Sequence, residues 1–329
     1  MKRSIPIAAS AALAVAATGE AIAGRRHAAS QVTRHVDAGG YRLAVTVRGR
    51  RPTPQTPTVV VVVGAGDCQT SWSAIADRLA EYTQVITYDR AGLGWSEAGP
   101  PPTAERYVVE LQAVLHACLA NGRYVLAGHS LGGLIARLHA QQHPDRLAGL
   151  VQVDATPEAV AGDRGVRIGF AASGVMASVF KTLAPFGVIR LLLRLHAFPL
   201  YPEQRAFEAL VSSDRRQEWI ESVVRSMGPG GAAGSELRSV LACAHEAQRR
   251  VSGVVQPQFG DLPMAVLSSH AWGGDWWVGM HQELAARSLA STHRVFDDRL
   301  HNIHMAHPDA VVGAIGDILD AAGTGSAAR

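Results

Sequence analysis

Short apolar runs alternate with segments of helical periodicity along most of the chain. Four runs rich in β-branched or other apolar residues stand out: TVVVVVG (58–64), QVITYD (84–89), YVLAG (124–128) and LAGLVQVD (147–154). Continuous apolar runs of this length are typical of strands that are covered on both faces. Helical patterns lie between them, so the sequence predicts an α/β fold with a doubly wound, mostly parallel sheet.

This alternation stops between about residues 156 and 260, where helical stretches such as FAASGVMASVFKTLAPFGVIRLLLRL dominate. A glycine-rich segment, GPGGAAG (228–234), lies among them and is interpreted as a flexible connector. A strand pattern resumes at LPMAVLSS (262–269). We therefore predict a helical cap at 156–260, inserted between two parts of one core at 24–155 and 261–329.

The first 23 residues have the pattern of an export signal. Lys2 and Arg3 precede an apolar stretch that ends in the small-x-small sequence Ala21-Ile22-Ala23. We predict a cleaved signal peptide at 1–23 and a secreted or periplasmic protein. The alternative is a retained membrane anchor, but the stretch is short and rich in alanine rather than leucine. We therefore expect no stable membrane span after cleavage.

Composition narrows the functional classes further. The 329 residues are 47% hydrophobic and carry a formal net charge of +3, with the arginines scattered along the chain. A nucleic-acid partner is not expected, because such proteins concentrate basic residues on one face or helix. The three cysteines can form at most one disulfide, and no CxxC or Cys/His spacing suggests a metal site. No metal or organic cofactor is expected, and the sequence indicates no oligomeric state.

One motif carries specific chemistry. The segment RYVLAGHSLGG (123–133) predicts a strand, a tight turn with Ser130 at its tip, and a helix. Gly128 and Gly132 flank Ser130 at positions where a β-carbon would collide as the strand and helix approach each other. A serine held on a strained turn is a candidate nucleophile, provided that a base removes its proton.

The mature sequence resembles the α/β-hydrolase superfamily, specifically its capped serine hydrolases. GHSLGG is similar to the family's nucleophile elbow, VVVVVGAG followed by Trp72 to its oxyanion loop, and YDRAGLGWS (88–96) to the loop after its fourth strand. The resemblance implies an eight-stranded, mostly parallel sheet with an inserted helical cap. It also implies that backbone N–H groups of Ala65 and Leu131 form an oxyanion hole.

The resemblance places the base among the histidines near the end of the chain. His301 is the leading candidate, because it follows the last predicted strand and precedes Pro308 by seven residues, as in the family. His304 is either a supporting partner or a surface residue, and the surface is the expected place. A zinc set of His301, His304 and His307 was considered, but its i, i+3, i+6 spacing is not a recognised ligand pattern.

The carboxylate that orients this histidine has two candidates. Asp154 closes the strand LVQVD, next to the strand that leads to Ser130, whereas Asp275 lies in HAWGGDWW, about six residues beyond a strand. We predict Asp154 and keep Asp275 as the alternative. Trp272, Trp276 and Trp277 are expected either to wall the substrate pocket, together with Phe180, Leu183 and Phe186 of the cap, or to pack the cap onto the core.

These elements predict a serine hydrolase with a Ser130, His301 and Asp154 triad that cleaves a carboxylic ester of a small or medium apolar molecule. An aminopeptidase or amidase is a second interpretation, in which some of the acidic residues of the cap would hold a substrate ammonium group. Those acidic residues are Glu203, Glu208, Glu218, Glu221, Glu236 and Glu246, and a solvated face explains them equally. A third interpretation is a non-catalytic, ligand-binding member of the fold.

Overall fold

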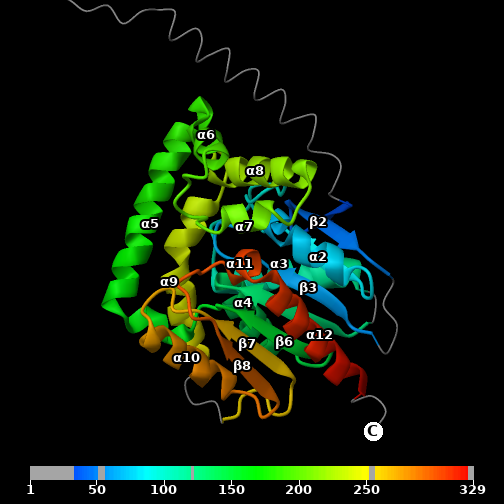
Figure 1. Cartoon of the computed structure of the whole chain (residues 1–329). Helices are drawn as coiled ribbons and strands as arrows, with labels where there is room; N and C mark the ends of the chain where they lie inside the picture. Colours follow the sequence, from blue (N-terminus) through cyan, green and yellow to red (C-terminus); the bar gives the residue numbers. More distant parts are fainter. Residues whose placement is uncertain (1–32, 51–55, 120–121, 252–255, 325–329) are drawn as a thin grey trace, which may run out of the picture.

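The computed structural model describes residues 33–50, 56–119, 122–251 and 256–324 (Figure 1). The predicted export signal therefore lies outside the described residues. The described chain forms a twisted sheet flanked by helices, with further helices above one end of the sheet (Figure 1).

Eight strands form one sheet in the order β1-β2-β4-β3-β5-β6-β7-β8. β1 pairs antiparallel with β2 and β2 antiparallel with β4, and the remaining neighbours all pair in parallel. The predicted fold class is thus confirmed. The strands are β1 (Arg34–Asp37), β2 (Arg42–Arg48), β3 (Thr58–Val62), β4 (Val85–Tyr88), β5 (Tyr124–His129), β6 (Leu147–Val153), β7 (Met264–Ser268) and β8 (Ser291–Val295).

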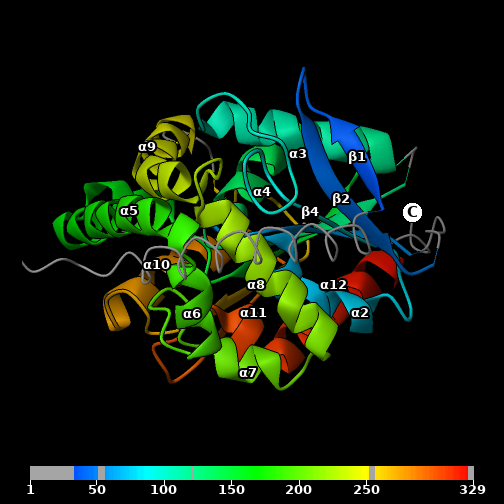
Figure 2. The same cartoon turned by 90° about the horizontal axis from the view of Figure 1, so that it is seen from above.

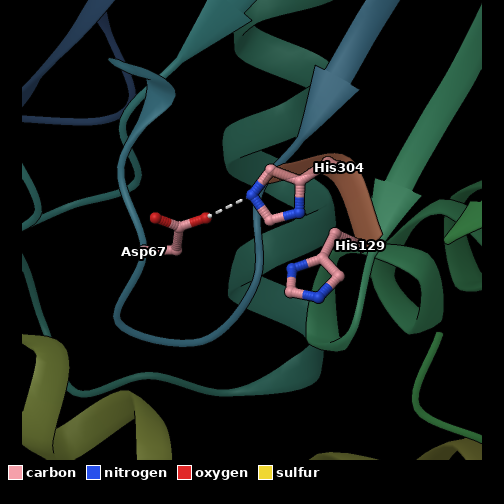
Figure 3. Close-up of side chains that lie close together, drawn as sticks. All are labelled: Asp67, His129 and His304. Carbon is pink, nitrogen blue, oxygen red and sulfur yellow. Dashed lines mark ion pairs between the residues drawn. The ribbon is translucent and has the colours of Figure 1, made fainter. Parts of the chain in front are cut away.

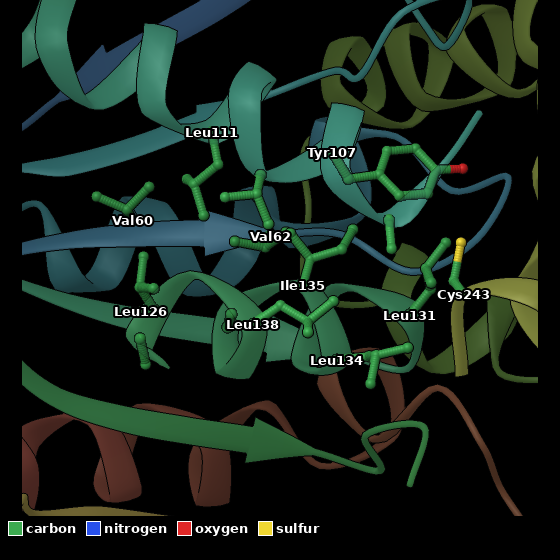
Figure 4. Packing of buried hydrophobic residues seen from close by; sticks show 14 of the residues in the cluster. Val60, Val62, Tyr107, Leu111, Leu126, Leu131, Leu134, Ile135, Leu138 and Cys243 are labelled. Atoms are coloured by element: carbon green, nitrogen blue, oxygen red, sulfur yellow. The ribbon is translucent and has the colours of Figure 1, made fainter. Parts of the chain in front are cut away.

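Helices cover both faces of this sheet, which explains why every residue of β3 is buried. Val60 and Val62 contribute to a core with the helices on one face, as Figure 4 shows. Val59 and Val61 contribute to the core on the other face, because side chains alternate along a strand. The helices around the sheet are η1 (Gln69–Trp72), α2 (Ser73–Leu79), α3 (Ala104–Cys118), α4 (Leu131–Gln142), α10 (Asp275–Ala285), α11 (Ile303–Ala306) and α12 (Pro308–Thr324).

Among the described residues between β6 and β7, all regular secondary structure is helical. Several of these helices lie above the sheet in Figure 1. The aromatic side chains of Phe198, Phe207 and Trp219, which this part of the chain contributes, belong to a separate buried cluster. The proposed cap boundaries at 156 and 260 stay a prediction. The helices are η2 (Glu158–Gly162), α5 (Arg164–Leu183), η3 (Ala184–Phe186), α6 (Val188–Arg194), α7 (Gln204–Glu208), α8 (Ser213–Met227) and α9 (Ala233–Val251).

The glycine-rich segment at 228–234 forms a close turn between α8 and α9. Gly231 N donates to Gly228 O at 2.9 Å, and Ala232 N donates to Gly92 O in the loop after β4 at 2.8 Å. A β-carbon on Gly92 would lie 2.7 Å from Cβ of Ala232. The segment that we interpreted as a loose connector is therefore packed against the core, because its small residues allow close backbone contact.

Candidate active site

Ser130 occupies a strained turn between β5 and α4. Its backbone angles, φ 51° and ψ −122°, lie in a region that side chains other than glycine rarely adopt. A β-carbon on Gly132 would lie 1.9 Å from Val62 O, and one on Gly128 would lie 2.6 Å from Gly132 O. Glycine at both positions therefore permits the turn that presents the Ser130 side chain.

His301 and Asp154 form a hydrogen-bonded chain with this serine. Oγ of Ser130 lies 3.0 Å from Nε2 of His301, and Nδ1 of His301 lies 2.6 Å from Oδ2 of Asp154. All three lie at the carboxyl edge of the sheet: Asp154 follows β6, and His301 lies on the loop after β8. The structure therefore brings together the serine, histidine and first-choice aspartate that the sequence indicated.

Asp275, the alternative carboxylate, points elsewhere. It is the first residue of α10, its side chain is fully exposed, and its carboxylate lies 3.6 Å from His270. Asp154, in contrast, is fully buried. The aspartate hydrogen-bonded to His301 is Asp154.

The second oxygen of Asp154 has its own donors. Oδ1 accepts from Nε1 of Trp277 at 2.9 Å and from the backbone N–H of Ser269 at 3.2 Å. These bonds orient the carboxylate plane and leave Oδ2 for His301. The His281 ring lies beyond, with Nε2 at 3.9 Å from Oδ1, and burial lowers the pKa of His281.

Two backbone amides near Ser130 are placed to act as donors to a substrate oxygen. Leu131 is the first residue of α4, so its N–H has no acceptor within the helix. Ala65 lies in the loop after β3, and both Gly64 and Ala65 line the same pocket as Ser130. Ala65 and Ser130 thus line one cavity, and Leu131 directly follows Ser130 in the chain.

A buried ion pair holds the loop that carries Ala65. Arg90 donates to Val63 O and Gly64 O, each at 2.6 Å, and pairs with Glu236 at 2.7 Å. Oε2 of Glu236 also accepts from Gly66 N at 2.8 Å. Burial opposes the charged form of Arg90, but the carboxylate of Glu236 raises the pKa of Arg90 above its ordinary value.

The sequence interpretation missed this pair, since Glu236 was counted among acidic residues that a solvated face would explain. Glu236 is 1% exposed. The helical pattern of α9 could have indicated this burial. Glu236 lies on the same helix face as Val240, Ala244 and Ala247, at intervals of three or four residues, and all three are buried. A carboxylate on an apolar helix face needs a buried partner.

Behind the site, His129, His304 and Asp67 lie close together (Figure 3). Nε2 of His129 lies 3.0 Å from the backbone oxygen of His301, and burial lowers the pKa of His129 well below its usual range. The ring is therefore neutral at pH 7 and donates its Nε2–H to that oxygen. This bond links the residue before Ser130 to the loop that carries His301.

The expectation that His304 lies on the surface was wrong. It is 2% exposed, stacks on Trp72 with ring centroids 4.9 Å apart, and has Nε2 3.5 Å from Oδ2 of Asp67. His129, His304 and Asp67 each offer one ligand atom, all within 4.8 Å of one another. One aspartate and two histidines could hold a divalent metal ion such as zinc.

The zinc set considered from the sequence is not brought together. His301, His304 and His307 each face a different carboxylate. Their partners are Asp154, Asp67 and Asp298, respectively.

Beside Ser130 lies a cavity of about 290 Å³. Most of its wall is apolar or aromatic, with Phe170, Leu200, Tyr201 and Met227 from the chain between β6 and β7 and Trp272 from the loop after β7. Asp67, Glu203, Arg299 and Asn302 add polar groups.

Of the tryptophans expected at the pocket, only Trp272 lines this cavity. Trp277 is buried on Asp154, and Trp276 is 41% exposed. The cap residues that we expected in the wall are also elsewhere: Phe180 is buried in the cluster between β6 and β7, and Phe186 is 59% exposed. Helical periodicity could not decide which face of α5 meets the pocket.

The chain belongs to the α/β hydrolase fold family, whose sequence profile matches residues 57–308. This confirms the resemblance seen in the sequence and makes the protein an α/β hydrolase. Curated relatives match only over part of their length. A putative carbamate hydrolase RutD of Klebsiella pneumoniae (strain 342) is 35% identical over 31% of this chain and 39% of its own. A probable transporter efuK of Hormonema carpetanum is 29% identical over 37% of this chain and 18% of its own.

Solved structures share the fold over most of the chain. An enol-lactonase from Burkholderia xenovorans LB400 aligns with a TM-score of 0.59 and 17% identity, covering 87% of this chain and 100% of its own. A thermophilic esterase from Thermogutta terrifontis aligns with a TM-score of 0.57 and 22% identity, covering 90% and 100%. The epoxide hydrolase CorEH aligns with a TM-score of 0.65 and 17% identity, covering 87% and 98%. At these identities the likeness concerns the fold alone.

Proposed function

We propose that this α/β hydrolase is a serine hydrolase that cleaves carboxylic esters through an acyl-enzyme. The observation that carries the proposal is the hydrogen-bonded chain from Ser130 Oγ through His301 to Asp154, at 3.0 and 2.6 Å. A serine hydroxyl becomes a competent nucleophile when an oriented imidazole can accept its proton.

In the proposed mechanism, His301 Nε2 accepts the proton of Ser130 as Oγ attacks the ester carbonyl. Asp154 holds the imidazole in the tautomer with Nδ1–H and stabilises the imidazolium that forms. The N–H groups of Ala65 and Leu131 donate to the oxyanion. His301 then protonates the departing alcohol, and a water molecule, activated by the same imidazole, hydrolyses the acyl-enzyme and regenerates Ser130.

The pocket supports a small or medium apolar substrate. Its volume of about 290 Å³ and its aromatic and aliphatic wall are suited to an apolar acyl or alcohol group. The structural neighbours include an esterase and an enol-lactonase, which is compatible with this substrate class. The epoxide hydrolase neighbour shows that the fold by itself does not select the reaction.

The proposal is tested by labelling with a fluorophosphonate, which reacts with an activated serine. The wild type is expected to become labelled, Ser130→Ala to remain unlabelled, and Ser173→Ala to be labelled like the wild type. Ser173 lines the same cavity but takes no part in the hydrogen-bonded chain, so it is a matched control. A folded wild-type protein that is not labelled would overturn the proposal in favour of a non-catalytic binding protein. Turnover of nitrophenyl esters of increasing acyl length would then measure the longest acyl chain that the pocket accepts.

One observation supports aminopeptidase activity as a second candidate. Glu203 is 3% exposed and lines the cavity, where a carboxylate could receive a substrate ammonium group. Its oxygens already accept from Asn302, from the backbone N–H at 3.1 Å and from Nδ2 at 2.8 Å, which favours the ester. Aminopeptidase activity would be supported if the protein hydrolysed amino-acyl anilides faster than esters and if Glu203→Gln lost the anilide activity.

A further inference from the structure

Helix α5 (Arg164–Leu183) is apolar on its outer face as well as on its inner face. Its inner side buries Phe170 and Phe180. Its outer side exposes Ile168, Val175 and Val179, which are 62%, 66% and 51% accessible. Spacings of seven and four residues place these three side chains in one stripe along the helix. Figures 1 and 2 both show α5 at the periphery of the molecule.

The exposed apolar surface continues beyond the helix. Phe186 in η3 and Leu191 and Leu195 at α6 are 59%, 56% and 62% accessible. Of the twelve large apolar side chains that are exposed in the described part of the chain, six therefore lie between 168 and 195. Such a concentration is unusual for a surface that only meets water.

This surface is also basic. Between Arg164 and Pro202 the sequence contains five Lys or Arg residues and no Asp or Glu, although one of them, Arg190, is buried and pairs with Glu221. Arg164 and Arg167 are exposed. The helical period places Arg164 about 40° and Arg167 about 100° around the helix from the apolar stripe, on the same side, so their long side chains can extend past it to an anionic surface.

The described helix that includes α5, residues 164–186, is long and apolar enough to span a membrane by length and composition, with 22% of its most apolar window buried in the protein. Its inner face, however, packs against α9 and supplies Phe170 and Ser173 to the pocket wall. A helix held in this way can lie on a bilayer with one face but cannot cross it without unpacking.

We propose that the outer face of α5, together with the exposed apolar residues of η3 and α6, binds the surface of a bilayer that contains anionic lipids. The apolar stripe enters the boundary between headgroups and acyl chains, and the flanking basic side chains meet the lipid phosphates. Water-soluble acidic partners would match the charge but not the apolar area, which is why the lipid surface is the fitting occupant.

Binding in this orientation would place α5 between the bilayer and the cavity, because Phe170 and Ser173 line the cavity from the inner side of that helix. An apolar ester dissolved in the membrane would then be held one helix diameter, about 10 Å, from the cavity wall. This consequence rests on the proposed ester hydrolysis. The binding itself does not, and its test below measures no turnover.

The test is co-sedimentation of the full chain with vesicles of phosphatidylcholine alone or mixed with phosphatidylglycerol. The wild type should bind the anionic vesicles at least tenfold more tightly than the neutral ones. The double variant Val175→Glu/Val179→Glu should lose at least tenfold in binding. The matched control is Val109→Glu/Leu289→Glu, which changes two apolar residues of similar exposure on other surfaces and should bind within twofold of the wild type.

A second double variant tests the proposal even if Val175→Glu/Val179→Glu fails to fold. Arg164→Gln/Arg167→Gln leaves the apolar stripe intact and should reduce binding to the anionic vesicles about fivefold, with little effect on the neutral ones. The proposal would be overturned if the wild type bound neither kind of vesicle. It would also be overturned if Val175→Glu/Val179→Glu and the arginine double variant both bound like the wild type. A dimer in sedimentation velocity that is lost in Val175→Glu/Val179→Glu would overturn it as well, because the face would then belong to a second copy of the chain.

Discussion

Oδ2 of Asp154 accepts a hydrogen bond from Nδ1 of His301 at 2.6 Å, although 147 positions separate the two residues in the sequence. The sheet makes this contact possible. Asp154 follows β6, the neighbour of β5 in the sheet, and Ser130 N donates to Val153 O at 3.1 Å. The carboxylate and the serine are thus placed on the same edge by one pair of adjacent strands.

Replacing the two candidate carboxylates should have very different effects. Asp154→Asn puts an amide where the imidazole needs an acceptor, and loss of the correct tautomer in a triad costs about 10⁴ in kcat. Asp275→Asn should leave kcat within twofold, because the Asp275 side chain is fully exposed. Ester turnover by both purified variants provides the measurement. Similar, small losses in the two would mean that neither carboxylate orients His301.

Trp277 should support catalysis through Asp154. Trp277→Phe removes the Nε1 donor to Oδ1 of Asp154 but keeps an aromatic ring, and a hydrogen bond to a charged group is worth about 1.5 to 3 kcal/mol. We expect kcat/KM to fall about tenfold, which corresponds to the lower end of that energy range. The loss should be no larger because Ser269 N still donates to Oδ1. Trp276→Phe, at the exposed neighbouring position, is the control and should stay within twofold. An unchanged Trp277→Phe enzyme would show that the Ser269 bond is sufficient.

The Arg90–Glu236 pair should influence kcat through the loop that carries Ala65. Glu236→Gln weakens the pair and the acceptor of Gly66 N, which shifts the position of the Ala65 N–H. Loss of one oxyanion donor costs about 10² to 10³ in kcat, so partial misplacement should cost at least about tenfold, with a smaller change in KM.

The control for this prediction is Glu221→Gln, which weakens another buried arginine–glutamate pair, with Arg190. Glu221 is not among the residues that line the cavity, and its carboxylate accepts from Arg190 and Gln217. Both variants should lower the unfolding midpoint, but only Glu236→Gln should lower kcat per fluorophosphonate-reactive site. If Glu236→Gln and Glu221→Gln lost kcat equally, the loss would come from reduced stability and not from the position of the Ala65 loop.

Glu158 should make stability depend on pH in the acid range. Burial by itself would raise the pKa of Glu158, but the guanidinium groups of Arg137 and Arg287 lower it to about 2. The folded state therefore favours the carboxylate, and its stabilising contribution is complete above the ordinary pKa of 4.5 and is lost as the pH falls toward 2. This shift corresponds to about 3 kcal/mol.

Glu158→Gln removes that dependence. At pH 7 the variant should be about 3 to 5 kcal/mol less stable, because the buried Arg137 loses its charged partner. The difference from the wild type should narrow steadily between pH 4.5 and 2 in urea unfolding experiments. Glu246→Gln, in a surface pair with Arg250, should change stability by less than about 0.5 kcal/mol at any pH. A constant difference for Glu158→Gln would contradict the lowered pKa.

Most of the core could be predicted from the sequence because its signals are local. The apolar runs of β3 and β5 are each contained in fewer than ten consecutive residues, and both strands form where the pattern indicated. The glycines around Ser130 also act locally, because they relieve collisions between the strand and the helix that immediately flank it. The prediction of His301 rests on the resemblance to the α/β hydrolases, in which the catalytic histidine lies at this distance from the final helix.

The acidic residues of the predicted cap could not be judged in this way. Glu236 and Glu203 carry the same charge as Glu246, yet the first two are buried against residues more than 90 positions away. Their partners, Gly66 and Asn302, belong to loops on opposite sides of the insertion in the sequence. No local pattern specifies such a pair, because the favourable interaction exists only after both loops have been brought to one edge of the sheet.

Local patterns are enough to predict the succession of strands and helices along the chain and the strained turn at Ser130, because spacing and side-chain shape act over a few residues, whereas the resemblance to the α/β hydrolases pointed to His301. The contact of His301 with Asp154 rather than Asp275, the burial of His304 and the face of α5 that meets the pocket are set only when the chain folds. Each of these depends on where a loop or helix packs after the sheet has formed, and long-range packing of this kind leaves little trace in the local sequence.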